Sequence, residues 1–278
     1  MIKRLFCNKM ILFGGSIVII FVVIAVFCPL LSPYDPYQIN LYDRLQSPCK
    51  AHLCGTDNIG RDVLSRIIYG TRVSLIIGVV ATLISMIFGL FFGVISGYFG
   101  GYVDKMILCL IDIMLAFPGL LLAIGVAVAI GPGLLTLFMA LSVVGWAGFA
   151  RMVRGVVMAA KEQVYVEAAR AIGVSDIGII IKHILPNCVS MVIVLATLKV
   201  GSFILGEAAL SFLGLGAQPP TPTWGSMVST GFAFLHSAPW ISIIPGLAIA
   251  VVVIGFNLLG DGLRDVFDPK LEANESRR

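Results

Sequence analysis

Two ionisable side chains of opposite charge fall within a stretch of the chain that is otherwise apolar. Lys199 and Glu207 both lie in the run 187–209, eight residues apart. In a helix this spacing places them on about the same face, separated by roughly 12 Å along the axis. Because that distance is too long for a direct ion pair, each is expected to face a cavity or a neighbouring helix. Ionisable groups in such surroundings are candidates for function. We therefore predict that Lys199, Glu207 and Ser211 line a polar path, and that neutralising Glu207 slows passage along it.

A second group of reactive side chains is the segment Cys49-Lys50-Ala51-His52-Leu53-Cys54. Two thiols this close could form a disulfide on an oxidising side of a membrane, and the alternative is two free thiols. With His52 they could also hold a metal ion, but two thiols and one imidazole lack the fourth ligand of a structural zinc site. We expect no metal site, and the pair Cys49 and Cys54 stays open between a disulfide and free thiols.

The chain lacks the residues that would make it an enzyme acting on nucleotides. It contains no Gly-x-x-x-x-Gly-Lys-Ser/Thr segment, the loop that holds nucleotide phosphates. It also lacks a compatible pair of catalytic groups with the spacing of the intramembrane proteases. We therefore predict no catalytic activity and no directly bound cofactor.

The composition indicates a protein that lies in lipid. Of its 278 residues 59% are hydrophobic and 12% are charged, and the mean hydropathy is +1.02. A soluble domain carries roughly 25% charged residues, so this chain has too little polar surface to cover itself in water. The formal net charge of +4 needs no nucleic acid to explain it, because the basic residues lie where membrane topology places them.

The apolar runs predict six membrane-spanning helices. A span needs about 20 apolar residues, and the two longest uncharged runs must each be divided. Gly131-Pro132-Gly133 divides the first, and the proline-rich segment 218–223 ends helix formation in the second. The expected spans are 11–31, 73–97, 106–130, 134–150, 187–209 and 239–260.

The basic residues indicate which ends face the cytoplasm. Six spans place both termini on one side. If that side is cytoplasmic, thirteen Lys and Arg residues lie on inner segments and five lie in the outer loop or at the mouth of the second span. This distribution follows the positive-inside rule, so both termini are predicted to be cytoplasmic. The first span lacks a small-x-small cleavage site and is expected to stay as an anchor.

A polar segment stands out between the fourth and fifth spans. Helical spacing of small and apolar residues predicts one short helix over 161–173, with Gly173 as its stop. Ser175 and Asp176 cap a second helix over 177–185, and Pro186 leads into the fifth span. The two helices make a compact knob on the inner side. The small side chains of Ala168 and Ala169 are expected to leave its surface low enough for a partner to approach closely. A plain helical linker is the alternative.

The outer loop before the second span has its own pattern. Val63, Ile67 and Ile68 share one face of a short helix, which we expect to lie on the membrane before the chain turns in. The turn-forming residues of 55–62 make a pattern that is too specific for a plain connecting loop.

These segments resemble the permease subunits of ATP-binding-cassette (ABC) importers. Glu167-Ala168-Ala169-x-x-x-Gly173 followed by Leu185-Pro186 is similar to the cytoplasmic signature of that family. His183 departs from it, since an aliphatic residue is usual there. Further motifs resemble the dipeptide/oligopeptide/nickel branch, and more narrowly its second, C-type permease. They are Gly55-Thr56-Asp57, Gly60-Arg61-Asp62, 211–216, 219–222, Trp224-Gly225 and 256–265, and the resemblance runs from about Ile11 to Lys270.

The resemblance implies an all-α integral membrane protein of the type I importer fold, in a bacterial inner membrane, with coupling helices between spans 4 and 5. It implies as partners a second homologous permease, two cytoplasmic ATP-binding subunits that carry ATP and Mg²⁺, and an extracytoplasmic solute-binding protein. The residues expected to contact the ATPase are Glu167, Ala168, Ala169, Gly173, His183, Leu185 and Pro186.

The implied function is import of dipeptides or oligopeptides, with nickel or a metal–chelator complex as the alternative cargo. A proton-coupled transporter, with Asp112, Glu207 and His236 as relay groups, would not need the cytoplasmic knob. The expected domains are an anchor and outer loop (1–70), a transmembrane core (71–270) with the coupling loop 151–186, and a cytoplasmic tail (271–278).

Overall fold

The computed structural model describes residues 8–267, and over that range the protein is built from helices. The prediction for the tail 271–278 lies outside these residues. Five helices of the described residues are long and apolar enough to cross a membrane. They are α2 (Lys9–Val26), α4 (Val63–Phe99), α7 (Leu134–Lys161), the continuous helix Asp176–Phe212 and α12 (Trp240–Phe267). A sixth crossing is the bent pair α5 (Gly101–Ala116) and α6 (Gly119–Ile130). The prediction of an all-α membrane fold with six crossings is confirmed.

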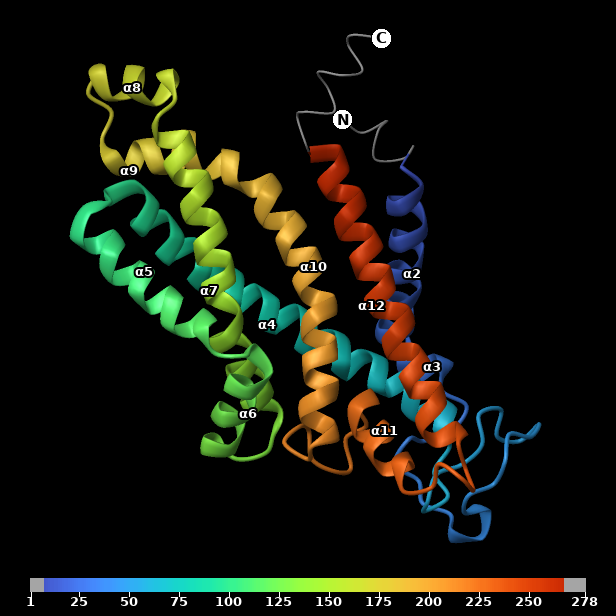
Figure 1. Ribbon diagram of the computed structural model, residues 1–278. Helices are drawn as coiled ribbons and strands as arrows, with labels where there is room; N and C mark the ends of the chain where they lie inside the picture. Colours follow the sequence, from blue (N-terminus) through green and yellow to red (C-terminus); the bar gives the residue numbers. More distant parts are fainter. Residues whose placement is uncertain (1–7, 268–278) are drawn as a thin grey trace.

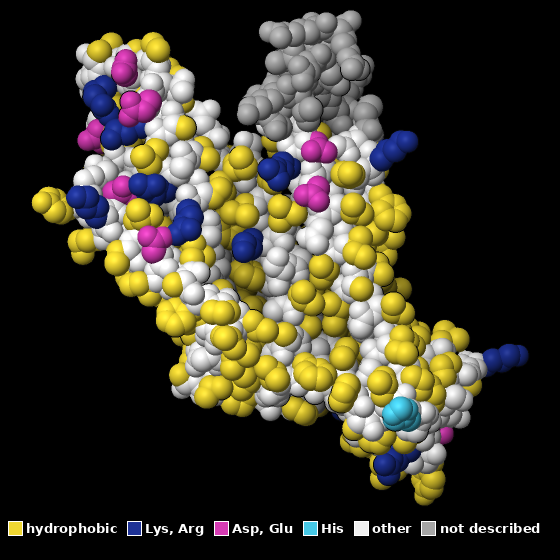
Figure 2. Space-filling model, in the orientation of Figure 1, with side chains coloured by type: hydrophobic (Ala, Val, Ile, Leu, Met, Phe, Trp, Pro, Cys, Tyr) yellow, Lys and Arg dark blue, Asp and Glu magenta, His cyan; other side chains and the backbone are white. Residues whose placement is uncertain are grey.

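The short helices lie at the two ends of the bundle. α8 (Val164–Ala171) and α9 (Asp176–Ile179) lie at the same end as the start of α2 and the end of α12 (Figure 1). α6 and α11 (Trp224–Phe232) lie at the opposite end, and α3 (Cys28–Leu31) follows directly from the end of α2 (Figure 1). Charged side chains gather over the end that carries α8, whereas the middle of this face is mainly hydrophobic (Figure 2). The knob and the outer loop therefore lie on opposite sides of the membrane.

α4 and α7 form the most extensive helix pair of the bundle. Gly89, Gly93 and Gly97 lie four residues apart on α4 and face α7. A Cβ at Gly93 would lie 2.7 Å from Val153 Cβ, and one at Gly97 would lie 2.8 Å from Val157 Cβ. Small residues at this spacing allow helix backbones to approach closely in a membrane.

α4 corrects the expectation of a separate surface helix before the second span. The chain is one helix of 37 residues from Val63 to Phe99. Asp62 caps it by accepting a hydrogen bond from Ser65 N at 2.8 Å, and no residue after it interrupts the helix. At 1.5 Å per residue the helix is about 55 Å long, longer than the roughly 30 Å apolar layer of a bilayer. Its first turns therefore belong to the outer region.

The expected span 106–130 is also wrong in detail, because it is not one straight helix. α5 ends at Ala116 and α6 begins at Gly119, with a bend of 92° between them. Pro118 cannot donate a backbone hydrogen bond and disfavours helical conformation at Phe117, which is extended here. The result is a broken crossing in which α6 packs against α7.

Candidate functional site

The cytoplasmic knob consists of α8, α9 and the π-helical turn η2 (Ile180–Ile184). Ser175 caps α9 by accepting a hydrogen bond from Gly178 N at 3.3 Å, as predicted. The second short helix is not separate, however. η2 runs directly into α10 (Leu185–Phe212), and Leu185 N bonds to Ile180 O across the widened turn. The part of the knob formed by α9 and η2 is thus a helical extension of the fifth span.

The inner face of α8 is fixed in a hydrophobic cluster. Val166 and Ala169 are buried there against residues of α7 and of the α9–η2 segment, among them Val157, Ile179 and Ile184. Ala169 therefore does not contribute to the knob's outer surface, contrary to the prediction. Its position three residues after Val166 turns it toward the bundle. Its role is to let α8 pack closely.

The outer face of α8 presents both charge and apolar surface. Glu167 and Ala168 are exposed, as predicted. Beside them Val164 is 78% exposed and Ile172 is 82% exposed. These two apolar side chains were not expected as contact residues, although their exposure at the tip of a polar segment is typical of an interaction surface.

Gly173 ends this surface with a backbone conformation that favours glycine. Its φ is +82°, and no atom lies within 4 Å of where a Cβ would be. The requirement for glycine is therefore conformational and not steric. The exposed Gly173 makes the turn that returns the chain from α8 to α9.

The remaining predicted contact residues lie at the base of the knob. His183 is half-buried, and its ring centroid lies 6.2 Å from that of Tyr165 on α8. Asn187 Nδ2 donates to His183 O at 2.6 Å and to the Tyr165 hydroxyl at 3.1 Å. Leu185 is partly buried, whereas Pro186 is exposed in the first turn of α10. This base ties α8 to α10.

A polar contact that the sequence did not indicate fixes the knob to α4. The Tyr98 hydroxyl donates to Asp176 Oδ1 at 2.5 Å, and Lys161 Nζ donates to Tyr98 O at 2.8 Å. Tyr98 and Asp176 are 78 residues apart in the chain, so no spacing rule could have found the pair. The contact joins the end of α4 to the start of α9.

Two further ion pairs join α5 to α7 near the same end. Arg154 Nε and Nη2 donate to the two oxygens of Asp104 at 2.6 and 2.7 Å. Arg151 pairs with Asp112 on an exposed face. A bidentate pair fixes orientation as well as distance, so the first half of the broken crossing is held in register with α7.

Glu207 lies in a closed polar contact between α10 and α4. Its side chain is 0% exposed. Ser211 Oγ donates to Glu207 Oε1 at 2.6 Å, and Ser74 Oγ donates to Oε2 at 3.0 Å. The sequence leaves open whether Glu207 faces a cavity or a neighbouring helix. In the structure its side chain faces the neighbouring helix α4.

A groove beside α10, the helix of the predicted path, is apolar. It has a volume of about 290 Å³ between α6, α7 and α10, and Leu120, Leu141 and Phe203 are among the residues that line it. None of Lys199, Glu207 and Ser211 is among its lining residues in the described part of the chain. Lys199 is half-buried elsewhere on α10. Its role in a path stays a prediction.

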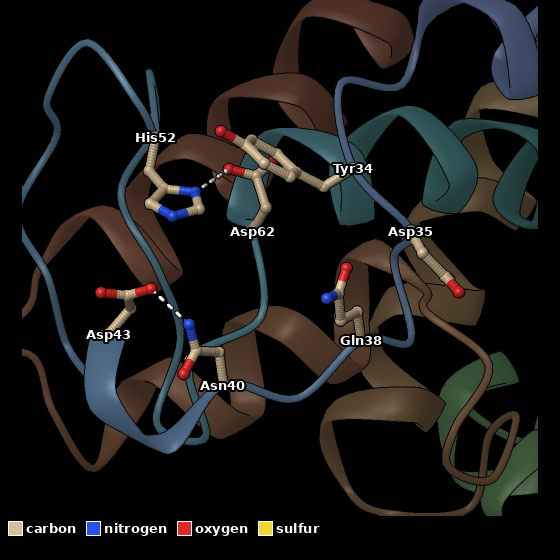
Figure 3. Close-up of a pocket in the computed structure, with 8 residues that line it drawn as sticks. Tyr34, Asp35, Gln38, Asn40, Asp43, His52 and Asp62 are labelled. Carbon is tan, nitrogen blue, oxygen red and sulfur yellow. Dashed lines mark hydrogen bonds and ion pairs between the residues drawn. The ribbon is translucent and has the colours of Figure 1, made fainter.

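The outer loop folds around a small polar pocket of about 100 Å³. His52 Nδ1 lies 2.9 Å from Asp62 Oδ1, and the Tyr34 ring centroid is 4.9 Å from that of His52 (Figure 3). Asn40 Nδ2 donates to Asp43 Oδ2 at 2.5 Å on another wall, and Asp35 and Gln38 lie on the adjoining segment (Figure 3). The side chains here hold the loop together.

Cys49 and Cys54 are both free thiols in this structure. Cys49 Sγ accepts a hydrogen bond from His52 N at 3.4 Å. Burial, and next the charge of Asp62, raise the pKa of the Cys54 thiol. Pairing of the two thiols under oxidising conditions stays a prediction.

Comparisons with known proteins agree with this arrangement. Residues 89–273 match the family described as "Binding-protein-dependent transport system inner membrane component", and residues 1–48 match the "N-terminal TM domain of oligopeptide transport permease C". A dipeptide transport system permease protein from Alkalihalophilus pseudofirmus is 45% identical over 271 residues, which cover 98% of this chain and 89% of that protein. A glutathione transport system permease protein from Shigella flexneri serotype 5b is also 45% identical, over 97% of this chain and 89% of that protein.

Among solved structures, a chain of the methionine ABC transporter MetNI, in an inward-facing conformation, has a similar fold. The TM-score is 0.60 at 19% identity, and the match covers 74% of this chain and 98% of that chain. The family is a transmembrane component of ABC transporters and is not itself catalytic. The chain belongs to the binding-protein-dependent transport system inner membrane components, and it is a multi-pass ABC importer permease of the bacterial inner membrane.

Proposed function

We propose that this permease imports short peptides, driven by two cytoplasmic ATP-binding subunits that act on the exposed face of α8. The observation that carries the proposal is the knob itself. Val164 and Ile172 expose apolar surface beside Glu167 on the short helix α8, which packs on the inner end of the helix Asp176–Phe212 that crosses the membrane. A helix with such a face fits a groove on a partner.

The energy source would lie outside this chain. The sequence contains no phosphate-binding loop, so ATP and Mg²⁺ would be bound by the ATPase subunits. A second, homologous permease would complete the pathway, and an extracytoplasmic binding protein would deliver the substrate. The names of the two relatives, a dipeptide and a glutathione permease, support peptides as the cargo.

The test is uptake by the complete importer in proteoliposomes. Radiolabelled alanyl-alanine should accumulate only with ATP on the ATPase side and binding protein on the other. Accumulation of nickel ions in place of the peptide would favour the metal alternative. Peptide uptake driven by a proton gradient without nucleotide would contradict the proposal.

The role of α8 has its own variant. Glu167→Lys reverses a charge on the exposed face of α8 and should lower uptake at least about fivefold, the size of effect expected for losing a contact of roughly 1 kcal/mol. Glu162→Lys makes the same change at an exposed side chain just before α8 and serves as the control. Equal uptake by the two variants would count against α8 as the contact.

A further inference from the structure

A second outer pocket, of about 250 Å³, lies between the segment 58–66, which leads into the first turn of α4, and the segment around α11. The first segment contributes Asn58, Ile59, Arg61 and Arg66. The second contributes Ala217, Pro219, Thr221, Ser226 and Thr230. Trp224 Nε1 donates to Ile67 O at 3.2 Å and holds the two segments together.

Within residues 8–267 the two arginines of the pocket form ion pairs with a single carboxylate, that of Asp57. The side chains of Arg61 and Arg66 are 12% and 7% exposed. Both approach the same group, with Arg61 Nε at 2.6 Å and Arg66 Nε at 3.7 Å from Asp57 Oδ2. Two guanidinium groups against one carboxylate favour an additional anion, since unpaired buried charge is costly.

The two arginines also keep hydrogen-bond donors to spare. Toward the described residues Arg61 donates through Nε to Asp57, and Arg66 donates through Nη1 to Pro36 O at 3.2 Å. Each guanidinium carries five N–H groups. The geometry of these groups suits a carboxylate, which can accept two at once.

Asn58 also lines this pocket and carries a polar atom without a partner in the described part of the chain. Its Oδ1 is buried and accepts no hydrogen bond from any of the residues 8–267. A buried, unpartnered polar atom is rare and calls for a partner. A ligand that satisfies the whole pocket therefore has a carboxylate for the arginines and an N–H group for Asn58.

We propose that this pocket binds the carboxy-terminal residue of a transported short peptide, with its carboxylate on Arg61 and Arg66 and its amide N–H on Asn58 Oδ1. The site rests on the proposed function and adds to it a specific recognition of the free carboxyl end. A peptide end carries the carboxylate and the N–H on one residue. An Asp or Glu side chain of a docking protein brings the carboxylate alone.

The size of the pocket agrees with this choice. Its volume is several times the roughly 30 Å³ share of one water molecule, so it holds more than a carboxylate group. Ile59, Ala217 and Pro219 give it an apolar part, which suits the body of a small residue. The ligand class is an α-carboxylate with a neighbouring N–H.

The decisive variant is Asn58→Asp. It keeps the shape of the side chain but places a carboxylate beside the two arginines, where it competes with that of the substrate. Uptake of radiolabelled alanyl-alanine by the complete importer, at saturating binding protein, should fall about tenfold, as expected for losing a charge-assisted hydrogen bond. Asn58→Leu removes only the neutral acceptor, and we expect a loss of about threefold.

Which of the two variants loses more uptake distinguishes a binding role of Asn58 from a purely structural role. A merely structural Asn58 would make Asn58→Leu at least as harmful as Asn58→Asp, and this order would overturn the proposal. Gln46→Glu adds the same charge at an exposed side chain of the outer loop and should transport like the wild type. Melting temperatures of the variants show whether a loss of uptake reflects unfolding.

The source of the carboxylate is tested in the same assay. If the loss in Asn58→Asp appears only as a higher half-saturating concentration of binding protein, the carboxylate belongs to that protein and the proposal is wrong. Equal uptake by wild type and Asn58→Asp would contradict the proposed binding pocket but leave the proposed function of the permease intact. No peptide uptake by the wild type would overturn the proposed function, and the site with it.

Discussion

Glu207 shows how one buried carboxyl group can join two helices of a membrane protein. Its two oxygens accept hydrogen bonds from Ser74 on α4 and from Ser211 on its own helix. Each hydroxyl is buried and would lose its partner if the carboxyl group were removed. The group therefore stabilises the contact between α4 and α10 in the first place.

We expect Glu207→Ala to lower the melting temperature of the purified permease complex clearly more than Ser74→Ala does. The alanine leaves a cavity and two hydroxyls without an acceptor, at about 1–3 kcal/mol for each unsatisfied buried group. Glu207→Gln keeps an acceptor oxygen and should fall between wild type and Glu207→Ala. If Glu207→Gln melts like wild type but transports much more slowly, the carboxylate charge has a direct role in the path.

The residue types of this site could be predicted, but its contacts could not. Glu207 stands out in the sequence because it is ionisable in an apolar run. Ser74 lies 133 residues earlier and looks like any other serine of a span. Arg61 is part of the motif Gly60-Arg61-Asp62, and Arg66 follows one helical turn later, yet their pocket needs the segment 217–230 to close it. Only the packed structure brings these segments together.

At the scale of elements, the contact between Tyr98 and Asp176 joins the end of α4 to the start of α9. It is a polar contact between the knob and α4, beside the hydrophobic cluster in which the knob packs against α4 and α7. Because Lys161 also bonds to Tyr98 O, three helices meet there. A displacement of α8 by a partner would reach α4 through this contact.

Tyr98→Phe should weaken coupling without blocking assembly. It removes the hydrogen bond to Asp176 but keeps the ring in the cluster, a change of about 1 kcal/mol. We expect two- to fivefold fewer peptides transported per ATP hydrolysed. Tyr102→Phe, at an 86% exposed side chain of α5, is the control. An unchanged ratio of transport to hydrolysis in Tyr98→Phe would show that the contact is not used.

The spans themselves were predictable because hydropathy alone requires them, and the capping of α9 by Ser175 followed from local chemistry. The break at Pro118 was missed, since an apolar run with one proline reads as a single span. The length of α4 was missed because its outer turns are amphipathic and its later turns are apolar. The two patterns predict two helices, but the backbone forms one helix from Val63 to Phe99.

At the scale of the whole molecule, six crossings separate an inner face with α8 from an outer face with two pockets. The reactivity of the Cys54 thiol can show which side of the membrane the outer loop faces. This thiol is half-buried at the outer end, and its pKa is raised. The reactive thiolate therefore forms at higher pH than in an ordinary thiol, whose pKa is about 8.5.

In a variant that keeps Cys54 as its only cysteine, a membrane-impermeant methanethiosulfonate should react from the outer side. The rate should rise about tenfold per pH unit and continue to rise beyond pH 8.5, because the folded protein disfavours the thiolate. In the wild type, labelling of this thiol only after reduction would show that Cys49 and Cys54 form a disulfide. Reaction only from the cytoplasmic side would contradict the topology.

The unbroken helix from Asp176 to Phe212 has a mechanical consequence. Its 37 residues follow a curved helix axis of about 55 Å, with the knob at the inner end and Glu207 and Ser211 near the outer end (Figure 1). If α10 (Leu185–Phe212), about 42 Å long at 1.5 Å per residue, tilts by about 5° about its inner end, its outer end moves by about 4 Å. A rotation small enough to leave side-chain packing at the knob intact is therefore amplified into a displacement of atomic size on the far side of the membrane.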